Sequence, residues 1–242
     1  MPNSLLPRAA NLLGKPFGLN PYPRAFNNAS TEGEARRERA FDNIFKNSGW
    51  ASSESRSGPG SELHRTRRYA NELRNYLDTT GARKVFDAPC GDLNWILPAV
   101  AGKDYVGGDI SPALIANLQT KHPELDTRRF DICEDEFPDA DVWHCRDCLF
   151  HLPFSDIESA LVRFAASSIP IALLTTHWTA ALHTNVDVPV GGWRYLDLRK
   201  APISLPQPQQ RLRDYRFMRD FPRYVGVWSR EQIKQAIQRF RT

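Results

Sequence analysis

Short apolar segments alternate with longer segments of helical pattern from residue 84 onward, and this alternation constrains the fold more than any other feature. Parallel neighbouring strands need long right-handed connections, which are usually helices. The order therefore predicts an α/β fold with a mostly parallel sheet, and one of the expected helices spans 92–102. The expected strands are 84–88, 104–109, 128–132, 141–146 and 171–176, followed by two C-terminal strands at 215–220 and 223–228.

The chain before residue 81 has a different composition. Residues 1–34 are rich in Pro, Asn, Ser and Gly and lack periodicity, which predicts a loosely ordered N-terminal arm. Residues 35–80 are expected to form a helical extension with a Ser/Gly loop, and residues 81–242 the main domain. Glycines beside hydroxyl side chains suit close approach to a ligand, so Ser57 and Gly58 are expected over the binding site. A plain linker is the alternative.

Acidic residues stand at the ends of three successive predicted strands. Asp87, Asp109 and Asp131 hold these positions, and Arg146 and Asp147 follow the fourth strand. Ligands bind sheets of this kind beyond the carboxyl ends of the strands. Asp109 comes 22 residues after Asp87 (109 − 87), close to the spacing of about 20 at which an acidic group meets ribose hydroxyls. Because a carboxylate repels a 2′-phosphate, the expected ligand carries an unphosphorylated ribose.

The motif series reads VFDAPCGDLNW (85–95), YVGGDIS (105–111), RRFDIC (128–133) and DVWHCRDCLFHL (141–152). In this order it resembles class I S-adenosylmethionine-dependent methyltransferases. The resemblance implies a Rossmann-like, doubly wound sheet with an antiparallel C-terminal strand, and S-adenosylmethionine as cofactor. Of the family's G-x-G-x-G motif only Gly91 is present, which fits a ligand without a pyrophosphate and argues against NAD.

The resemblance also implies roles for the strand-end residues. The turn after the first strand should meet the methionine amino group and the ribose, and Asp109 the ribose hydroxyls. Asp131 should lie at the adenine edge, and Arg146 near the transferred methyl group. From the residues alone, Asp109 as an ordinary turn residue and Asp131 as a helix cap remain alternatives. With the two loop residues, the expected cofactor-binding set is Asp87, Ala88, Pro89, Cys90, Gly91, Asp92, Asp109, Ile110, Asp131, Ile132, Arg146, Ser57 and Gly58.

Two missing family signatures favour a hydroxyl or carboxyl oxygen as the acceptor. Amino-group methylases carry an N/D-P-P-Y/F run after the fourth strand, where this chain has RDCLFHLP. The cytosine-C5 branch uses a Pro-Cys nucleophile there, whereas Cys90 lies in the cofactor turn. A hydroxyl loses its proton during methylation, and a positioned base typically contributes about 10² to 10⁴ in rate. His151 is the expected base, with Asp147 four residues earlier orienting it or binding the acceptor. Packing of His151 under a loop is the alternative, and His144 is expected on the other strand face.

A long segment at about 177–210 is expected to bind the acceptor. Trp178, Trp193 and Tyr195 lie there among polar side chains, which suits a sugar or another polyhydroxyl ring. A looser resemblance to methyltransferase domains found with glycan-assembly enzymes implies a glycan or small-molecule acceptor methylated on a sugar hydroxyl. Three alternatives stay open: an insertion that packs on its own sheet, a methyltransferase acting on protein, lipid or nucleic acid, and a non-catalytic cofactor-binding module.

Charge and cysteine content limit the partners. The net charge of +4 argues against nucleic acid, because nucleic-acid binders concentrate Lys and Arg in stripes. No run reaches the roughly 18 apolar residues of a membrane span, and the first residues lack a secretory signal, so a cytoplasmic protein is expected. Cys145 and Cys148 form a C-x-x-C without a second pair at zinc spacing, which predicts reduced thiols and no metal site. Nothing in the sequence indicates a particular oligomeric state.

Overall fold

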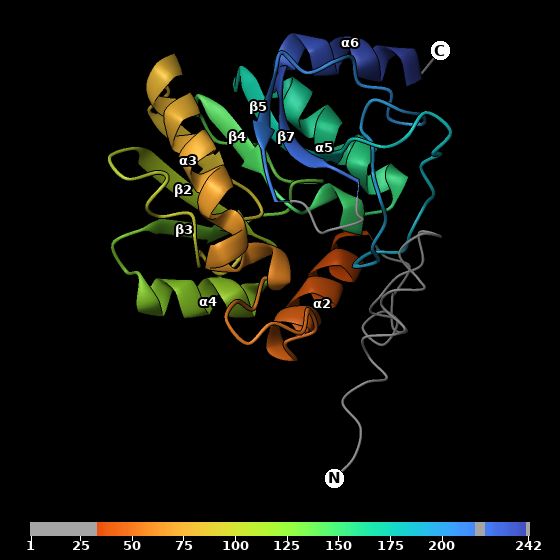
Figure 1. The fold of residues 1–242 in the computed structure, drawn as a ribbon. Coiled ribbons are helices and arrows are strands. Elements are labelled where there is room, and N and C mark those ends of the chain that lie inside the picture. The colour runs from red at the N-terminus through yellow and green to blue at the C-terminus, as the bar shows by residue number, and fades with distance from the viewer. Residues whose placement is uncertain (1–32, 216–220, 241–242) are drawn as a thin grey trace.

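The computed structural model of the chain describes residues 33–215 and 221–240, which contain one seven-stranded sheet (Figure 1). Its strands are β1 (Lys84–Asp87), β2 (Asp104–Asp109), β3 (Asp126–Arg129), β4 (Val142–Cys145), β5 (Ile171–His177), β6 (Gln210–Arg213) and β7 (Arg223–Ser229). The strand order is β3-β2-β1-β4-β5-β7-β6. β1 to β5 pair in parallel, and β7 is antiparallel to both β5 and β6. The predicted Rossmann-like sheet with an antiparallel C-terminal strand is confirmed.

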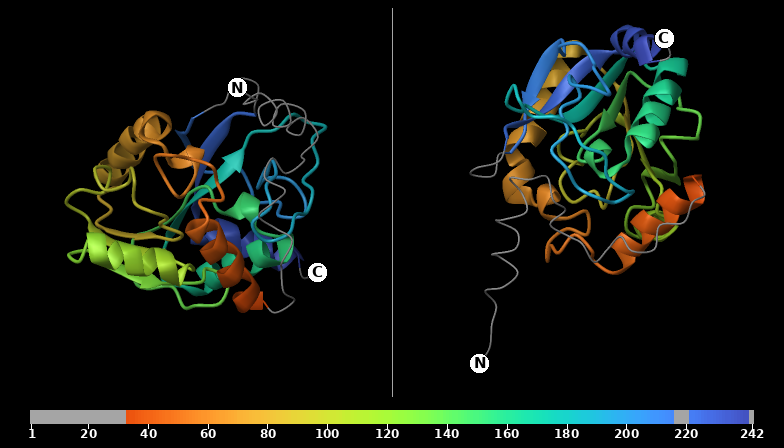
Figure 2. Two further views of the ribbon diagram at one scale, coloured as in Figure 1. Left: turned by 90° about the horizontal axis from the view of Figure 1, so that it is seen from below. Right: turned by 90° about the vertical axis from the view of Figure 1, so that its right-hand side faces the viewer.

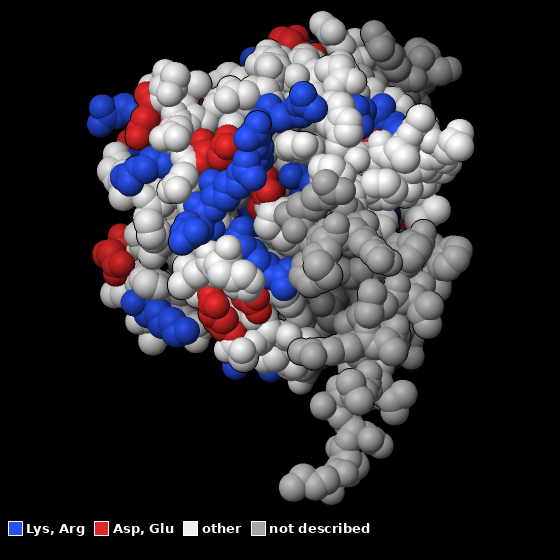
Figure 3. Space-filling model, viewed as in Figure 1, with Lys and Arg blue, Asp and Glu red and all other residues white. Residues whose placement is uncertain are grey.

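Helices cover both faces of the sheet. α3 (Leu63–Thr80) and α4 (Pro112–Lys121) pack on one face, and α5 (Phe154–Ala166) and α6 (Arg230–Phe240) on the other. α2 (Gly33–Lys46) belongs to the N-terminal extension and lies beside α4, at the opposite end of the molecule from α6 (Figures 1 and 2). β6 forms an edge of the sheet next to α3, and Lys and Arg side chains gather over this part of the surface (Figure 3).

Three parts of the chain either differ from the sequence-based expectation or lie mostly outside the described residues. Residues 92–102 form consecutive turns instead of a helix, because Leu93 has a φ of 58° and Pro98 cannot donate a helical hydrogen bond. The strand expected at 215–220 falls almost entirely outside the described residues, while β6 forms at the end of the expected insertion. The expected arm at 1–34 also lies outside them, except for the start of α2.

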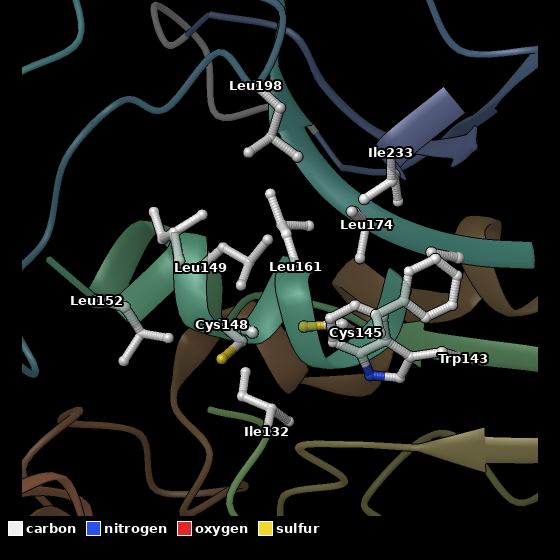
Figure 4. Packing of buried hydrophobic residues seen from close by; sticks show 14 of the residues in the cluster. Ile132, Trp143, Cys145, Cys148, Leu149, Leu152, Leu161, Leu174, Leu198 and Ile233 are labelled. Carbon is white, nitrogen blue, oxygen red and sulfur yellow. The ribbon is translucent and has the colours of Figure 1, made fainter. Parts of the chain in front are cut away.

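Two hydrophobic cores lie on either side of the sheet. The core under α5 and α6 contains Trp143, Leu161 and Ile233, together with the thiols of Cys145 and Cys148 (Figure 4). All four cysteines are free, and three of them are buried, which agrees with the predicted reduced thiols. Among the helices of residues 33–215 and 221–240, none combines the length and the apolar character that crossing a bilayer requires.

Buried charge fastens α2 to the rest of the domain. Arg37 is 3% exposed and donates to Asp131, after β3, at 3.0 and 2.9 Å, and to Asp156 of α5 at 3.0 Å. On the other side of the helix, Asp42 accepts a hydrogen bond from the hydroxyl of Ser111, which precedes α4. Removing one partner of a buried ion pair costs about 3 to 5 kcal/mol. The extension is therefore an integral part of the folded domain.

Candidate active site

A cavity of about 1420 Å³ opens at the carboxyl ends of β1, β2 and β4. Its walls come from the N-terminal extension, the strand ends and the segment after β5. Of the residues singled out in the sequence, Ala88 does not line it, because Ala88 is fully buried and its backbone bonds to residues of β4. The other candidate residues line the cavity: Asp87, Pro89, Cys90, Gly91, Asp92, Asp109, Ile110, Asp131, Ile132, Arg146, Asp147, His151, Ser57 and Gly58.

Two buried aspartates form one wall of the cavity. Asp87 ends β1 and is 2% exposed, and Asp109 ends β2 and is 7% exposed. The Asp109 carboxylate accepts hydrogen bonds from the amides of Gly91 at 3.2 Å and Ser111 at 3.0 Å. Burial raises the pKa of Asp109 to about 6, and the neighbouring Asp87 adds to the rise. No Lys or Arg of the described residues forms an ion pair with either carboxylate, so this wall suits a ligand with positive charge and hydroxyl donors.

A histidine and a tyrosine that the sequence analysis did not select bind Asp87, and a second tyrosine binds the histidine. His144 Nδ1 lies 2.6 Å from one carboxylate oxygen of Asp87, and the hydroxyl of Tyr105 donates to the other at 2.7 Å. His144 Nε2 lies 3.0 Å from the hydroxyl of Tyr69 on α3. Asp87 and His144 are register partners in adjacent parallel strands, so both side chains face the same side of the sheet. Placing His144 on the other face was wrong, and the strand register was the signal that could have found it.

The Ser/Gly loop of the extension closes on the turn after β1. Asp92 accepts hydrogen bonds from the hydroxyls of Ser55 and Ser57 at 3.0 Å and from the amide of Arg56 at 2.7 Å. Gly91 has a φ of 58°, and a Cβ there would lie 2.4 Å from Ser57 Oγ. Both the backbone and the neighbouring loop therefore require glycine at this position.

The Asp131 carboxylate is committed to protein partners. One oxygen accepts from Arg37 at 3.0 and 2.9 Å, and the other from the amide of Cys133 at 2.9 Å. Ile110 and Ile132 line the cavity nearby as apolar surface. The ends of β2 and β3 thus present apolar side chains beside the ion pair that anchors α2.

Arg146 and Asp147 follow β4 as predicted, but both are bound to other protein groups. Arg146 donates to Asp214 at 2.9 and 3.0 Å and to the carbonyl of Gly60 at 3.0 Å. Asp147 has a φ of 55°, and Arg223 of β7 donates to its carboxylate at 2.6 Å. Although burial opposes it, Arg146 and Arg223 hold the pKa of Asp147 below its ordinary value. An anion held by two guanidinium groups is a poor proton acceptor.

His151 faces the cavity from a short turn before α5. Its Nδ1 lies 2.6 Å from the carbonyl oxygen of Gly192, so Nδ1 carries the proton and Nε2 is left as an acceptor. Burial lowers the pKa of His151 to about 4, although the bond to Gly192 and the charge of Asp147 act in the other direction. Trp50 and Phe150 flank the ring, each with its centroid 4.4 Å away. Asp147 makes no hydrogen bond to His151, and the carbonyl of Gly192 orients the imidazole in its place.

Two glycines shape the part of the insertion that contacts His151. The amide of Gly191 donates to the carbonyl of His151 at 2.7 Å, next to the bond that Gly192 accepts. A Cβ at Gly192 would lie 2.8 Å from the carbonyl oxygen of Pro189 and 2.8 Å from Val188 Cβ. A larger residue would therefore displace the carbonyl that orients the imidazole.

Beyond this turn, a buried arginine docks the insertion. Arg194 is fully buried and donates to a backbone carbonyl before α5 at 2.6 Å. Its neighbours Trp193 and Tyr195 line the cavity. Trp178, the third aromatic residue expected to meet the acceptor, lies outside the lining, and the guanidinium of Arg199 covers its ring at 3.3 Å.

The titratable groups of the cavity give little support to thiol chemistry. Burial raises the pKa of the Cys90 thiol well above its ordinary value, and Asp109 and Asp87 add to the rise. Cys90 is therefore protonated at neutral pH and is a poor nucleophile. In the part of the chain that the structure describes, no group of three or more His, Cys, Asp or Glu side chains is placed to hold a metal ion.

No protein-family model and no curated protein matches the sequence. Solved structures do match. Magnesium protoporphyrin IX methyltransferase from Synechocystis PCC 6803, with S-adenosylhomocysteine bound, is 13% identical with a TM-score of 0.51, over 86% of this chain and 92% of that one. The methyltransferase domain of bacterial CtHen1-CN is 12% identical with a TM-score of 0.52, over 69% and 100%. The S-adenosylmethionine-dependent methyltransferase SibL is 15% identical with a TM-score of 0.55, over 93% and 70%.

At sequence identities this low, the structural similarity establishes the fold alone. The chain has the fold of class I S-adenosylmethionine-dependent methyltransferases, which the motif series predicts, and the resemblance is confirmed at that level.

Proposed function

We propose that this protein is an S-adenosylmethionine-dependent O-methyltransferase that acts on a sugar hydroxyl of a glycan or on a small polyhydroxyl compound. One observation carries the proposal. A single cavity joins two buried aspartates, Asp87 and Asp109, which pair with no Lys or Arg of the described residues, to His151, a neutral histidine with Nε2 left to accept a proton. S-adenosylmethionine has a positive sulfur, an amino group and a ribose diol, which complement the aspartate wall.

The strand-end residues hold the cofactor in this proposal. Asp109 accepts the ribose hydroxyls, and Asp87 with the turn up to Asp92 meets the amino group and the sugar. Ile110 and Ile132 offer apolar surface to the adenine. When bound, the cofactor would supply an electrophilic methyl group to the acceptor oxygen, and the electron pair of the methyl–sulfur bond would stay on sulfur.

Asp131 and the loop act indirectly. Because the Asp131 carboxylate is bound by Arg37, it supports the adenine site by anchoring α2. Ser57 and Gly58 close the Ser/Gly loop over the turn after β1, and Gly60 in the same loop accepts from Arg146. Removal of the extension would therefore open the site on several sides.

His151 removes the acceptor proton in this proposal. Its Nε2 takes the hydroxyl proton while the oxygen forms its bond to the methyl carbon, and the Nδ1 bond to Gly192 keeps the imidazole in the required tautomer. The positive charge that develops on the ring is stabilised by the nearby Asp147, whose negative charge raises the pKa of His151. Asp147 thus serves as a fixed anion.

Aromatic side chains form most of the acceptor half of the cavity: Trp50, Phe150, Trp193, Tyr195 and Phe221. Such rings pack against the flat faces of a sugar or of another ring compound and keep water away from the reacting hydroxyl. Their position supports an acceptor ring between the insertion and Trp50 of the extension.

The test is a screen of hydroxylated acceptors by mass spectrometry. The protein is incubated with S-adenosylmethionine and with neutral oligosaccharides, acidic oligosaccharides, polyols or phenols. We expect the gain of one methyl group on a saccharide or polyol, with equal formation of S-adenosylhomocysteine. Methylation of phenols alone would contradict the sugar acceptor. Tight binding of S-adenosylmethionine with no turnover on any acceptor would indicate a non-catalytic module.

A further inference from the structure

Lys and Arg side chains gather on the face that carries α3 and β6 (Figure 3). We define the arginine band as Arg68 of α3 with Arg211 and Arg213 of β6, which are all exposed. Arg65, one helical turn before Arg68, lines the cavity, and so does Tyr215, two residues after Arg213. Both elements therefore lead from the rim of the cavity to the band.

The charge of the arginine band is not neutralised by its described neighbours. Within residues 33–215 and 221–240, none of its three side chains forms an ion pair with an Asp or Glu. Glu72, one turn beyond Arg68 on α3, is half-buried and makes no ion pair with them. Arg211 is held over the ring of Trp178 at 4.3 Å. Alternate residues of a strand are about 7 Å apart, so Arg211 and Arg213 present two cations at about this spacing on one face of β6.

From this arrangement we infer that the acceptor is one unit of an anionic polysaccharide, whose acidic groups bind the arginine band while the unit to be methylated enters the cavity. The inference rests on the proposed transfer to a sugar hydroxyl and adds the charge of the chain that carries it. Guanidinium groups bind carboxylates and phosphates with charge-assisted, often bidentate hydrogen bonds. Several such contacts along one chain give stronger binding than a single sugar unit obtains in the cavity.

Single-stranded nucleic acid carries regular charge as well, but proteins bind it largely by stacking its bases on open aromatic rings. Two aromatic rings next to the arginine band, Trp178 and Tyr224, are already paired with arginines. Arg199 and Arg211 cover Trp178 at 3.3 and 4.3 Å, and Arg211 lies 5.6 Å from the ring of Tyr224. The band thus offers cations without an open stacking platform, which favours a polymer recognised by its charges.

The test compares the binding of three fluorescently labelled probes by anisotropy over a range of salt concentrations. The probes are an oligogalacturonate, a neutral dextran oligosaccharide of equal length and a single-stranded DNA of equal charge. The band variant is Arg68→Gln with Arg211→Gln and Arg213→Gln. The control variant removes the same charge from other faces through Lys121→Gln, Arg163→Gln and Lys234→Gln, which are exposed on α4, α5 and α6.

We expect the wild type to bind the oligogalacturonate more tightly than the dextran or the DNA. The slope of log affinity against log salt should fall by about three in the band variant, one for each lost contact, and should stay unchanged in the control variant. Equal losses in both variants, equal binding of dextran, or tighter binding of DNA would each overturn the inference. The affinity for S-adenosylmethionine is measured in parallel and should be the same in all three proteins. If the wild type does not bind S-adenosylmethionine, the proposed function is overturned, whatever the three probes show.

Discussion

The half of the cavity around Asp87 and Asp109 and the half around His151 are built from different kinds of sequence. In the first half, each carboxylate follows directly from a strand of the parallel sheet, and most of its partners come from the adjacent strands and the turns that follow them. In the second half, His151 depends on Gly192, 41 residues later, and on Trp50 of the extension.

The difference shows which parts of such a site the sheet determines. Strand ends bring the aspartates together wherever this sheet forms, because parallel strands end at the same edge. The half around His151 forms only when the extension and the insertion have both docked, through Arg37 and Arg194 respectively. We therefore expect substitutions in the two halves to affect different measurements: cofactor affinity for the first half and turnover for the second.

The largest effect is expected for the proposed base. His151→Ala should lower kcat by about 10² to 10⁴, because the imidazole acts mainly in the transition state. The affinity for S-adenosylmethionine should stay nearly unchanged. Steady-state kinetics with the acceptor found by mass spectrometry checks this, with His122→Ala outside the cavity as the control. A variant that retains full kcat would remove His151 from the mechanism.

The docking of the extension can be tested through stability. Arg37→Met should lower the free energy of unfolding by about 3 to 5 kcal/mol, because it leaves Asp131 and Asp156 buried without this cation. The matched control is Arg36→Met on the same helix, whose side chain is 25% exposed and which should cost about 1 kcal/mol or less. Urea denaturation measures both. Equal costs would show that the buried pairs do not distinguish Arg37 from its more exposed neighbour.

A smaller effect is expected from the turn that orients His151. Gly192→Ala should displace the carbonyl and lower kcat roughly tenfold, since a misplaced base loses part of its contribution of about 10² or more. Nitrogen NMR of labelled histidine should show the proton shifting from Nδ1 toward Nε2. Gly102→Ala is the control, because Gly102 lies outside the cavity lining and a Cβ there would meet no neighbour, so the backbone strain at its φ of 78° does not reach His151. An unchanged His151 tautomer in the Gly192 variant would contradict this positioning role.

The smallest effect concerns pH, and it separates the two halves. The pKa of His151 is lowered to about 4, so its neutral form is fully populated and kcat should be flat from pH 5.5 to 8. The pKa of Asp109 is raised to about 6, and ribose hydroxyls favour its ionised form. The affinity for S-adenosylmethionine should therefore be constant above pH 7 and fall as the pH drops below 6. A kcat that rises through pH 6.5 would contradict the lowered pKa of His151.

The half of the cavity around Asp87 and Asp109 could be predicted because each of its signals lies within a short stretch of sequence. The aspartates end apolar strands, and the glycine that turns the chain after β1 is visible in VFDAPCGDLNW. One error there, a helix at 92–102, came from an apolar pattern that Pro98 and the positive φ of Leu93 prevent from becoming helical. The other was the strand face of His144, which is set by its register with Asp87.

The second half could not be predicted in detail, because its contacts join residues far apart in the chain. The bond between His151 and Gly192, the stacking of Trp50 on His151 and the pairing of Arg223 with Asp147 depend on how the loops dock. No periodic pattern of apolar and polar residues in the sequence indicates such contacts. The charge environment had the same limitation, because the pKa of His151 is lowered by burial, and no pattern in the sequence indicates that burial.

Calorimetric titration of S-adenosylmethionine into the wild type and into Asp109→Ala at pH 7.5 tests the central claim most directly. The claim is that the aspartate wall holds this cofactor through its ribose and its positive charge. We expect the wild type to bind and the folded variant to lose about 1 to 3 kcal/mol of binding free energy, the cost of leaving a buried hydrogen-bonding partner unmatched. Unchanged affinity in a folded variant, or tighter binding of NAD than of S-adenosylmethionine by the wild type, would contradict the account.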